Sequence, residues 1–191
     1  MRIPEDEVNS TIQNAQRKQT YTVWGIPPDD VVQRIKKIME PLRAEFGGPA
    51  IEPHITVVGS VLLSHDYVIE KFVNGCQNIE PYTCEVDQLV TRKFYYQPVS
   101  LLIHPCQSVG HFGGYLHRCS SHMPHLSLLY GNLTEDERNR AIQKVLELDD
   151  SIASLKFTMS RLVLYKTHNE ARDQHSWEKV MEYNLRPRNQ R

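Results

Sequence analysis

The chain has 191 residues, of which 40% are hydrophobic and 24% are charged, and its net charge is −1 at pH 7. This length and apolar content suit one compact domain or two small lobes that share a core. Proteins that bind long nucleic acids normally carry a basic surface, so the near-zero net charge argues against that class. No apolar run approaches the length of a membrane span, and the first residues lack the apolar centre of a secretory signal. We therefore expect a cytoplasmic monomer that binds neither membranes nor long nucleic acids.

The first half of the chain predicts alternating strands and helices after a flexible, polar extension over residues 1–19. Pro27-Pro28 and the Gly47-Gly48 pair separate the apolar segments, and Asp29 suits the beginning of a helix in which Pro41 predicts a kink. In chain order, we expect a strand over 21–26, a helix from 29 to Gly47, a strand that contains His54, a helix capped by residues 64–66 that runs to about 77, and a strand over 82–91.

The second half predicts the same order of elements. A His- and Gly-rich segment from about 105 to 123 stands where the first helix would be, and Thr134 to Glu137 has the pattern of a capping box. The expected elements are a strand over 99–103, a strand that contains His125, a helix from 134 to about 148, a strand over 155–166 and a last strand over 177–185.

The middle strands of the two halves share a motif. Pro53-His54-Ile55-Thr56 and Pro124-His125-Leu126-Ser127 each place a histidine two residues before a hydroxyl residue. Residues i and i+2 of a strand point to the same face, so each motif presents an imidazole and a hydroxyl together. Ile55, Val57, Leu126 and Leu128 would then face a core.

Two such motifs fit phosphoryl transfer at a phosphodiester. One group must take a proton from the attacking oxygen, and another must give a proton to the leaving oxygen. Histidine, with an ordinary pKa of about 6.5, suits both tasks, and hydroxyl groups can donate to the non-bridging oxygens as charge develops. A single histidine on a strand is more often structural, but the repetition favours a catalytic pair. The residues alone do not say which histidine is the acid and which the base.

The repetition extends beyond the motifs. His54 and His125 lie about 70 positions apart, and nearly the same interval separates Leu89 from Leu162. A duplicated unit is the simplest explanation, with a first repeat over about 20–97 and a second over about 98–186. A pseudo-two-fold axis between the repeats would bring the two histidine strands together.

Longer strings around the motifs resemble a known family. They are Tyr21-Thr22-Val23-Trp24-Gly25-Ile26-Pro27, Pro53-His54-Ile55-Thr56-Val57 and Met123-Pro124-His125-Leu126-Ser127-Leu128-Leu129-Tyr130. The two H-x-[ST] motifs resemble the 2H phosphoesterase superfamily, and the three strings resemble its plant-type cyclic phosphodiesterases. The resemblance covers about residues 20–186. It implies one bilobal α+β domain whose antiparallel sheets face a central cleft with helices outside, followed by a basic tail over 187–191.

The resemblance also implies an activity. Members of this family hydrolyse ADP-ribose 1'',2''-cyclic phosphate, a product of tRNA splicing, to ADP-ribose 1''-phosphate, and they open nucleoside 2',3'-cyclic phosphates to 2'-phosphates. They need no metal or other cofactor. The family's motif positions map onto His54 and His125 as catalytic residues and onto Thr56 and Ser127 as substrate-binding residues. The resemblance gives His125 the role of base and His54 that of acid, and we expect both limbs of a bell-shaped pH profile between about pH 5 and 8.

Aromatic residues near the motifs are further candidates. Trp24 and Tyr130 occupy positions that line the cleft in the family, and Trp24 could stack on a base or a ribose. For both residues, packing in the core or at the rim is the alternative interpretation. Phe94-Tyr95-Tyr96 is a weaker candidate, because consecutive residues of a strand alternate between faces and at least one should be structural.

Two alternative functions remain at this point. A cluster of histidines and cysteines suggests a zinc-binding module, but Cys119 and His122 have no matching pair upstream at the usual separation, so we expect no metal. A 2H-like domain that binds nucleotides without turning them over is the second alternative. The cluster consists of His104, Cys106, His111, His117, Cys119 and His122. The chain has two further cysteines, Cys76 and Cys84. None of the four cysteines belongs to a C-x-x-C motif, and we expect all of them to be free thiols.

Overall fold

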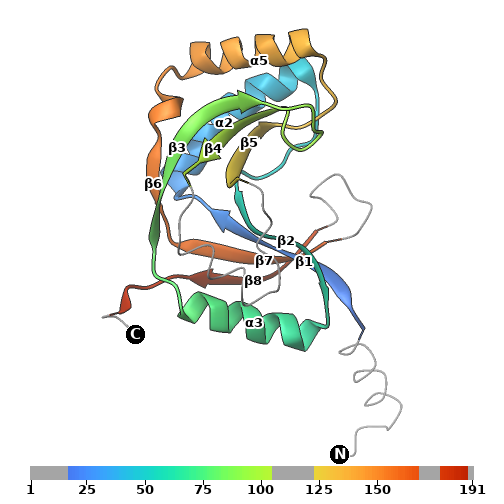
Figure 1. The fold of residues 1–191 in the computed structure, drawn as a ribbon, viewed down its shortest axis with the longest axis vertical. Coiled ribbons are helices and arrows are strands. Elements are labelled where there is room, and N and C mark those ends of the chain that lie inside the picture. The colour runs from blue at the N-terminus through green and yellow to red at the C-terminus, as the bar shows by residue number, and fades with distance from the viewer. Residues whose placement is uncertain (1–16, 105–122, 168–176, 189–191) are drawn as a thin grey trace, which may run out of the picture.

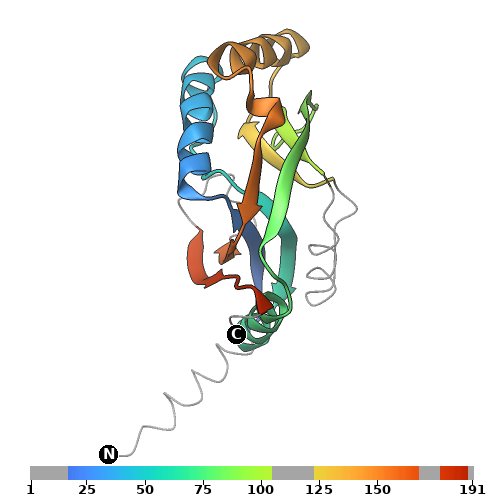
Figure 2. The ribbon, with the colours of Figure 1, turned by 90° about the vertical axis from the view of Figure 1, so that its left-hand side faces the viewer.

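The computed structural model describes residues 17–104, 123–167 and 177–188, and its class is α+β, as the sequence predicted. The strands form one antiparallel, eight-stranded sheet in the order β6-β3-β4-β5-β2-β1-β7-β8. In Figure 1, α5 lies across the top of this curled sheet and α3 across the bottom, and Figure 2 shows α2 along one side. The strands are β1 (Gln19–Ile26), β2 (Ile55–Leu63), β3 (Tyr82–Thr91), β4 (Val99–Ile103), β5 (His125–Leu129), β6 (Lys156–Met159), β7 (Arg161–Thr167) and β8 (Glu178–Asn184). The helices are α2 (Asp29–Phe46), α3 (His65–Gln77), α5 (Glu135–Leu148) and the short 3-10 helix η1 (Ile152–Ser154).

Local sequence explains where the helices begin and end. Helix α2 has Asp29 in its first turn, where a negative charge meets the positive end of the helix dipole, and ends at Gly47 with a φ of 79°. The same helix continues through Pro41 as one element. Helix α5 begins with the expected capping box, in which the Thr134 hydroxyl accepts from the Glu137 backbone N–H and the Glu137 carboxylate accepts from that of Thr134.

The two histidine strands lie at the centre of the sheet. Strand β2 pairs with β5 in antiparallel fashion, with Ile55 opposite Leu126. The expectation that these two strands lie together is therefore confirmed. Each side of this central pair holds half of the sheet, β5-β4-β3-β6 on one side and β2-β1-β7-β8 on the other.

The two halves of the chain exchange strands. Strand β3 ends the first half but pairs with β4, the first strand of the second half. Strand β7 lies in the second half but pairs with β1, the first strand of the first half. Each half of the sheet is thus built from strands of both halves of the chain.

The sequence predicted one strand over 155–166, and this prediction is wrong, because the chain forms β6 and β7 with a break at Ser160. Strand β6 pairs with β3, whereas β7 pairs with β1 and β8. One straight strand cannot pair with both halves of the sheet, so the chain bends at Ser160, whose carbonyl accepts from the Leu185 N–H at 2.7 Å.

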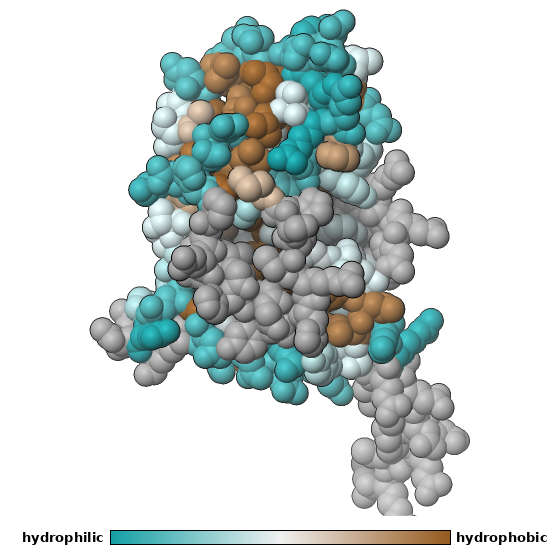
Figure 3. Space-filling model, viewed as in Figure 1, coloured by the Kyte–Doolittle hydropathy of each residue, from teal (hydrophilic) through white to brown (hydrophobic). Residues whose placement is uncertain are grey.

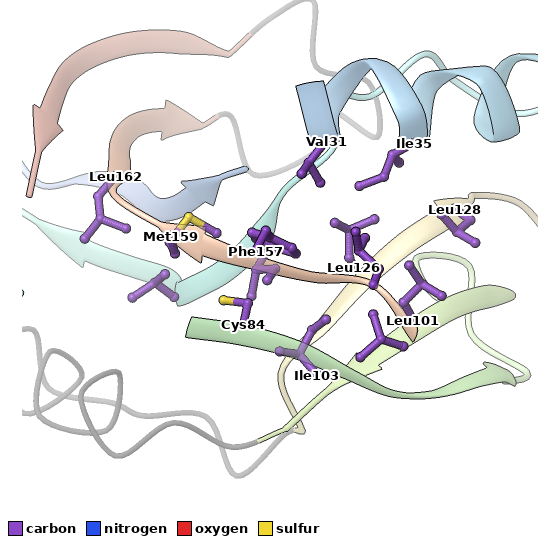
Figure 4. Packing of buried hydrophobic residues seen from close by; sticks show 14 of the residues in the cluster. Val31, Ile35, Cys84, Leu101, Ile103, Leu126, Leu128, Phe157, Met159 and Leu162 are labelled. Atoms are coloured by element: carbon purple, nitrogen blue, oxygen red, sulfur yellow. The ribbon is translucent and has the colours of Figure 1, made fainter. Parts of the chain in front are cut away.

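One apolar cluster spans both halves of the molecule. Figure 4 shows Val31 and Ile35 of α2 beside Leu126 and Leu128 of β5. The apolar residues of both motifs, Ile55 and Val57 on β2 and Leu126 and Leu128 on β5, are buried, as predicted. Burial of side chains of this size contributes roughly 1.5–3 kcal/mol each, which fixes the face that each strand turns to the core. In the described part of the chain, no helix has the length and apolar character required to cross a membrane.

Candidate active site

The two motifs lie side by side. The pairing of Ile55 with Leu126 sets His54 beside Ser127 and Thr56 beside His125, all on the opposite face of the two strands from the core. The side chains of His54, Thr56 and His125 are partly exposed, whereas Ser127 is 5% exposed. The structure therefore brings together the four residues that the motifs predicted.

The backbone holds both imidazoles in the same way. Nδ1 of His54 donates to the carbonyl oxygen of Glu52 at 2.7 Å, and Nδ1 of His125 donates to that of Met123 at 3.1 Å. A carbonyl oxygen only accepts, so each Nδ1 carries a hydrogen. Nε2 is then the nitrogen that can take up or release a proton in each ring.

His54 lies in an aromatic cluster. Its imidazole stacks on the indole of Trp24, with 3.4 Å between the ring centroids and 8° between the planes. Burial lowers the pKa of His54 to about 4, against the opposing effect of the hydrogen bond to Glu52, and the nearby charge of His125 lowers it further. In the ligand-free protein, His54 is therefore neutral at pH 7.

This arrangement changes the interpretation of Trp24. The indole is 3% exposed, and Tyr165 and Trp177 pack near it with centroid distances of 4.9 and 5.0 Å. It offers almost no surface to a ligand, so the expectation that it stacks on a base or ribose does not fit this structure. Trp24 instead packs against the imidazole of His54.

Ser127 also differs from the expected phosphate donor. Its hydroxyl donates to the carbonyl oxygen of Tyr96 at 2.6 Å, and the Ser100 hydroxyl lies 3.4 Å away. A serine hydroxyl has one proton to donate. Ser127 must leave the Tyr96 carbonyl before it can donate to a phosphate oxygen.

Tyr130 packs against this serine rather than at an open rim. Its side chain is 5% exposed and hydrogen-bonds to Ser127, and burial raises its pKa. The loop after α2 approaches it closely, because a Cβ on Gly48, which has a φ of 100°, would lie 2.2 Å from the Tyr130 carbonyl oxygen. Only glycine fits at this contact.

The sequence did not indicate that Tyr165 and Trp177 pack against the indole of Trp24. The available signal was that Val163 and Tyr165 alternate with buried leucines on β7. Of the three consecutive aromatic residues, Phe94 and Tyr96 are 64% and 51% exposed. Tyr95 is partly buried, and its carbonyl accepts from the Gly131 N–H at 2.9 Å. The three residues lie in the turn between β3 and β4 and not on a strand, so the alternation of strand faces does not apply to them. Tyr95 alone of the three is partly buried.

The zinc alternative falls largely outside the described residues. In residues 17–104, 123–167 and 177–188, no group of three or more His, Cys, Asp or Glu side chains is placed to hold a metal ion. Apart from His104, the His/Cys cluster lies in residues 105–122, which the structure does not describe. Cys76 and Cys84 are buried free thiols, and burial raises the pKa of Cys76 to about 12.

Known proteins are similar to this chain in sequence and in fold. No family model matches the chain. It is 40% identical to the cyclic phosphodiesterase of Arabidopsis thaliana over 177 residues, which cover 90% of this chain and 98% of that protein.

Solved structures agree in fold. A structure described as a phosphoesterase has a TM-score of 0.60 at 13% identity, and LigT of E. coli without ligand has a TM-score of 0.57 at 13% identity. Each comparison covers 90% of this chain and 100% of the other. The fold is that of the 2H phosphoesterases, and the identity to the Arabidopsis protein extends over nearly the whole length of both chains. The chain is therefore an enzyme of the cyclic phosphodiesterase family.

Proposed function

We propose that this cyclic phosphodiesterase hydrolyses ADP-ribose 1'',2''-cyclic phosphate, a product of tRNA splicing, to ADP-ribose 1''-phosphate, and opens nucleoside 2',3'-cyclic phosphates to 2'-phosphates. The observation that carries the proposal is the pair of histidines at the beginning of two paired strands, His54 directly before β2 and His125 as the first residue of β5, each with Nδ1 bound to a backbone carbonyl. The proposed enzyme is a cytoplasmic monomer whose partner is this small substrate.

The proposed reaction needs two proton transfers. One histidine takes a proton from water through Nε2 as the water oxygen forms a bond to phosphorus. The bond between phosphorus and a ribose oxygen breaks, and the second histidine gives that oxygen a proton. The oxygen that leaves is O2'' of the ADP-ribose substrate or O3' of the nucleoside substrate, so the products are the 1''- and 2'-phosphates.

The pKa of His54 bears on the assignment of roles. A neutral His54 is ready to act as a base, whereas the family resemblance gives it the role of acid. His54 can act as the acid only if the negative charge of the bound phosphate raises its pKa. A substrate with an activated leaving group distinguishes the two assignments, because such a group departs without a proton. It should rescue the variant that lacks the acid, and rescue of His125→Ala but not His54→Ala would make His54 the base.

The hydroxyl groups would bind the phosphate oxygens. Thr56 lies on the same strand face as His54 and beside His125, where its hydroxyl can donate to a non-bridging oxygen. Ser127 can do the same only after its hydroxyl turns from the Tyr96 carbonyl. If it keeps that bond, Ser127 is a positioning residue that holds the turn before β4.

One experiment tests the proposal directly. The purified protein is offered ADP-ribose 1'',2''-cyclic phosphate and 2',3'-cyclic AMP in EDTA, and the opened bond is identified by phosphorus NMR. We expect turnover of both substrates with the 1''- and 2'-phosphates as products. The His54→Ala/His125→Ala double variant is the control for contaminating activity. Binding without turnover would support the non-catalytic alternative, and loss of activity in EDTA would contradict a metal-independent reaction.

A further inference from the structure

A pocket separate from the candidate active site lies between the β3–β4 turn and the segment that leads into α5. Its volume is about 210 Å³, and it is lined by three basic side chains, Arg92, Lys93 and Arg138, together with Phe94, Tyr95 and Asn132. Figure 3 shows hydrophilic side chains gathered at the upper right of the molecule, where Figure 1 places this turn and the beginning of α5. The pocket joins segments that lie far apart in the sequence.

The charge in this pocket is not balanced. In the part of the chain that the structure describes, no carboxylate lines it and no ion pair joins Arg92, Lys93 or Arg138 to an acidic side chain. Acidic residues occupy the first turn of α5, but Glu137 is held by Thr134 in the capping box. The pocket thus presents positive charge to any ligand that enters.

Arg138 makes this imbalance most evident. It is 7% exposed, and its guanidinium donates to the carbonyl oxygen of Leu133 at 2.5 Å. Arginine is rarely buried to this extent without an anionic partner, because removal of its charge from water costs free energy. A phosphate group offers oxygens that match the remaining guanidinium donors.

The pocket is tied to the candidate active site by two hydrogen bonds. Ser127 of the second motif donates to the Tyr96 carbonyl at 2.6 Å, and Gly131 N–H donates to the Tyr95 carbonyl at 2.9 Å. Tyr95 lines the pocket and is the chain neighbour of Tyr96. The pocket and the second motif therefore meet at the turn that contains Tyr95 and Tyr96.

We infer that this pocket binds the diphosphate group of the substrate while the cyclic phosphate lies between His54 and His125. The inference rests on the proposed function, because ADP-ribose 1'',2''-cyclic phosphate carries such a diphosphate on its ribose and 2',3'-cyclic AMP has no second phosphate. The pocket therefore makes the enzyme selective for cyclic phosphates that bear a diphosphate.

Steady-state kinetics of the full-length protein test the inference. The Arg92→Gln/Lys93→Gln variant should raise KM for ADP-ribose 1'',2''-cyclic phosphate roughly tenfold or more, because two charge-assisted contacts are lost. Its KM for 2',3'-cyclic AMP and its kcat for both substrates should stay within about twofold of the wild type. Arg92 is partly exposed and Lys93 is exposed, so their replacement should leave the fold intact. A melting curve of the variant checks this. Lys37→Gln, at an exposed position on α2, is the control for a general loss of positive charge.

A third substrate separates this inference from the proposed function. If the wild type opens 2',3'-cyclic AMP but not the ADP-ribose substrate, the proposed substrate is wrong, and a 2',3'-cyclic adenosine with a 5'-diphosphate still tests the pocket in the same variants. If the wild type turns over none of these substrates, calorimetry compares the affinity of ADP for the wild type and for Arg92→Gln/Lys93→Gln. Weaker binding of ADP by the variant would then support the inference. An equal change for substrates with and without a diphosphate, no change for either, or equal ADP binding by both proteins would overturn the inference.

Discussion

Protonation of His54 should destabilise the folded protein. Burial beside Trp24 lowers the pKa of His54 from 6.5 to about 4. A difference of this size between the folded and unfolded states corresponds to about 3 kcal/mol of free energy, which is an upper limit because the ring is partly exposed. The folded pKa is below the unfolded pKa, so this stability is fully present above about pH 6.5. It is lost as the pH falls towards 4, because the unfolded state then binds the proton more tightly.

The assay is urea unfolding of the wild type and of His54→Gln between pH 4 and pH 7.5. The free energy of unfolding of the wild type should fall by up to about 3 kcal/mol more over this interval than that of the variant. His104→Gln is the matched control, since His104 is a surface histidine beside Asp87 and its removal leaves the His54 contribution in place. Equal pH dependence in the wild type and His54→Gln would refute the reasoning, as would an NMR titration of His54 with an ordinary pKa.

Four further predictions concern activity and stability. His54→Ala and His125→Ala should each lower kcat about 10²- to 10⁴-fold without additivity in the double variant, and near-normal turnover by either folded single variant would contradict a two-histidine reaction. Thr56→Ser should keep nearly normal kcat/KM whereas Thr56→Ala should not, and a large defect in the serine variant would show instead that the methyl group packs the strand. Trp24→Leu should raise the pKa of His54 towards 6.5 because water reaches the ring, and an unchanged NMR titration would show that the indole does not set this pKa. Thr134→Ala should lower the free energy of unfolding by about 1 kcal/mol in urea without changing kcat/KM, and unchanged stability would mean that the capping box contributes little.

The lowered pKa of His54 also bears on the pH profile of the enzyme. A profile with both limbs between about pH 5 and 8 assumes nearly ordinary histidines. With the pKa of His54 at about 4, one limb of kcat/KM should move below pH 5, since kcat/KM reports the groups of the free enzyme.

Local signals made most of the fold predictable. Helix α5 could be placed because its capping box lies within four consecutive residues, and α2 because its apolar residues keep the helical period up to Gly47. The pairing of β2 with β5 could be expected because both strands carry the same motif. These features depend on neighbouring residues or on the repeated motif.

The features that the sequence could not predict depend on distant residues. Nothing near Ser127 indicates that its hydroxyl binds the carbonyl of Tyr96, which lies 31 residues away in the sequence. Trp24 was recognised as a residue near the site, but its stack on His54 depends on the register between β1 and β2, where Trp24 lies opposite Thr56. The break at Ser160 likewise depends on which strands are already paired at each half of the sheet.

The way in which β3 and β7 cross between the two halves of the chain limits how the protein can be divided. A fragment of half the length would hold one histidine motif and would have no partner for the strand that ends it. It could complete its sheet only by donating that strand to a second copy and receiving the equivalent strand in return. Neither half of the chain therefore carries the candidate site alone.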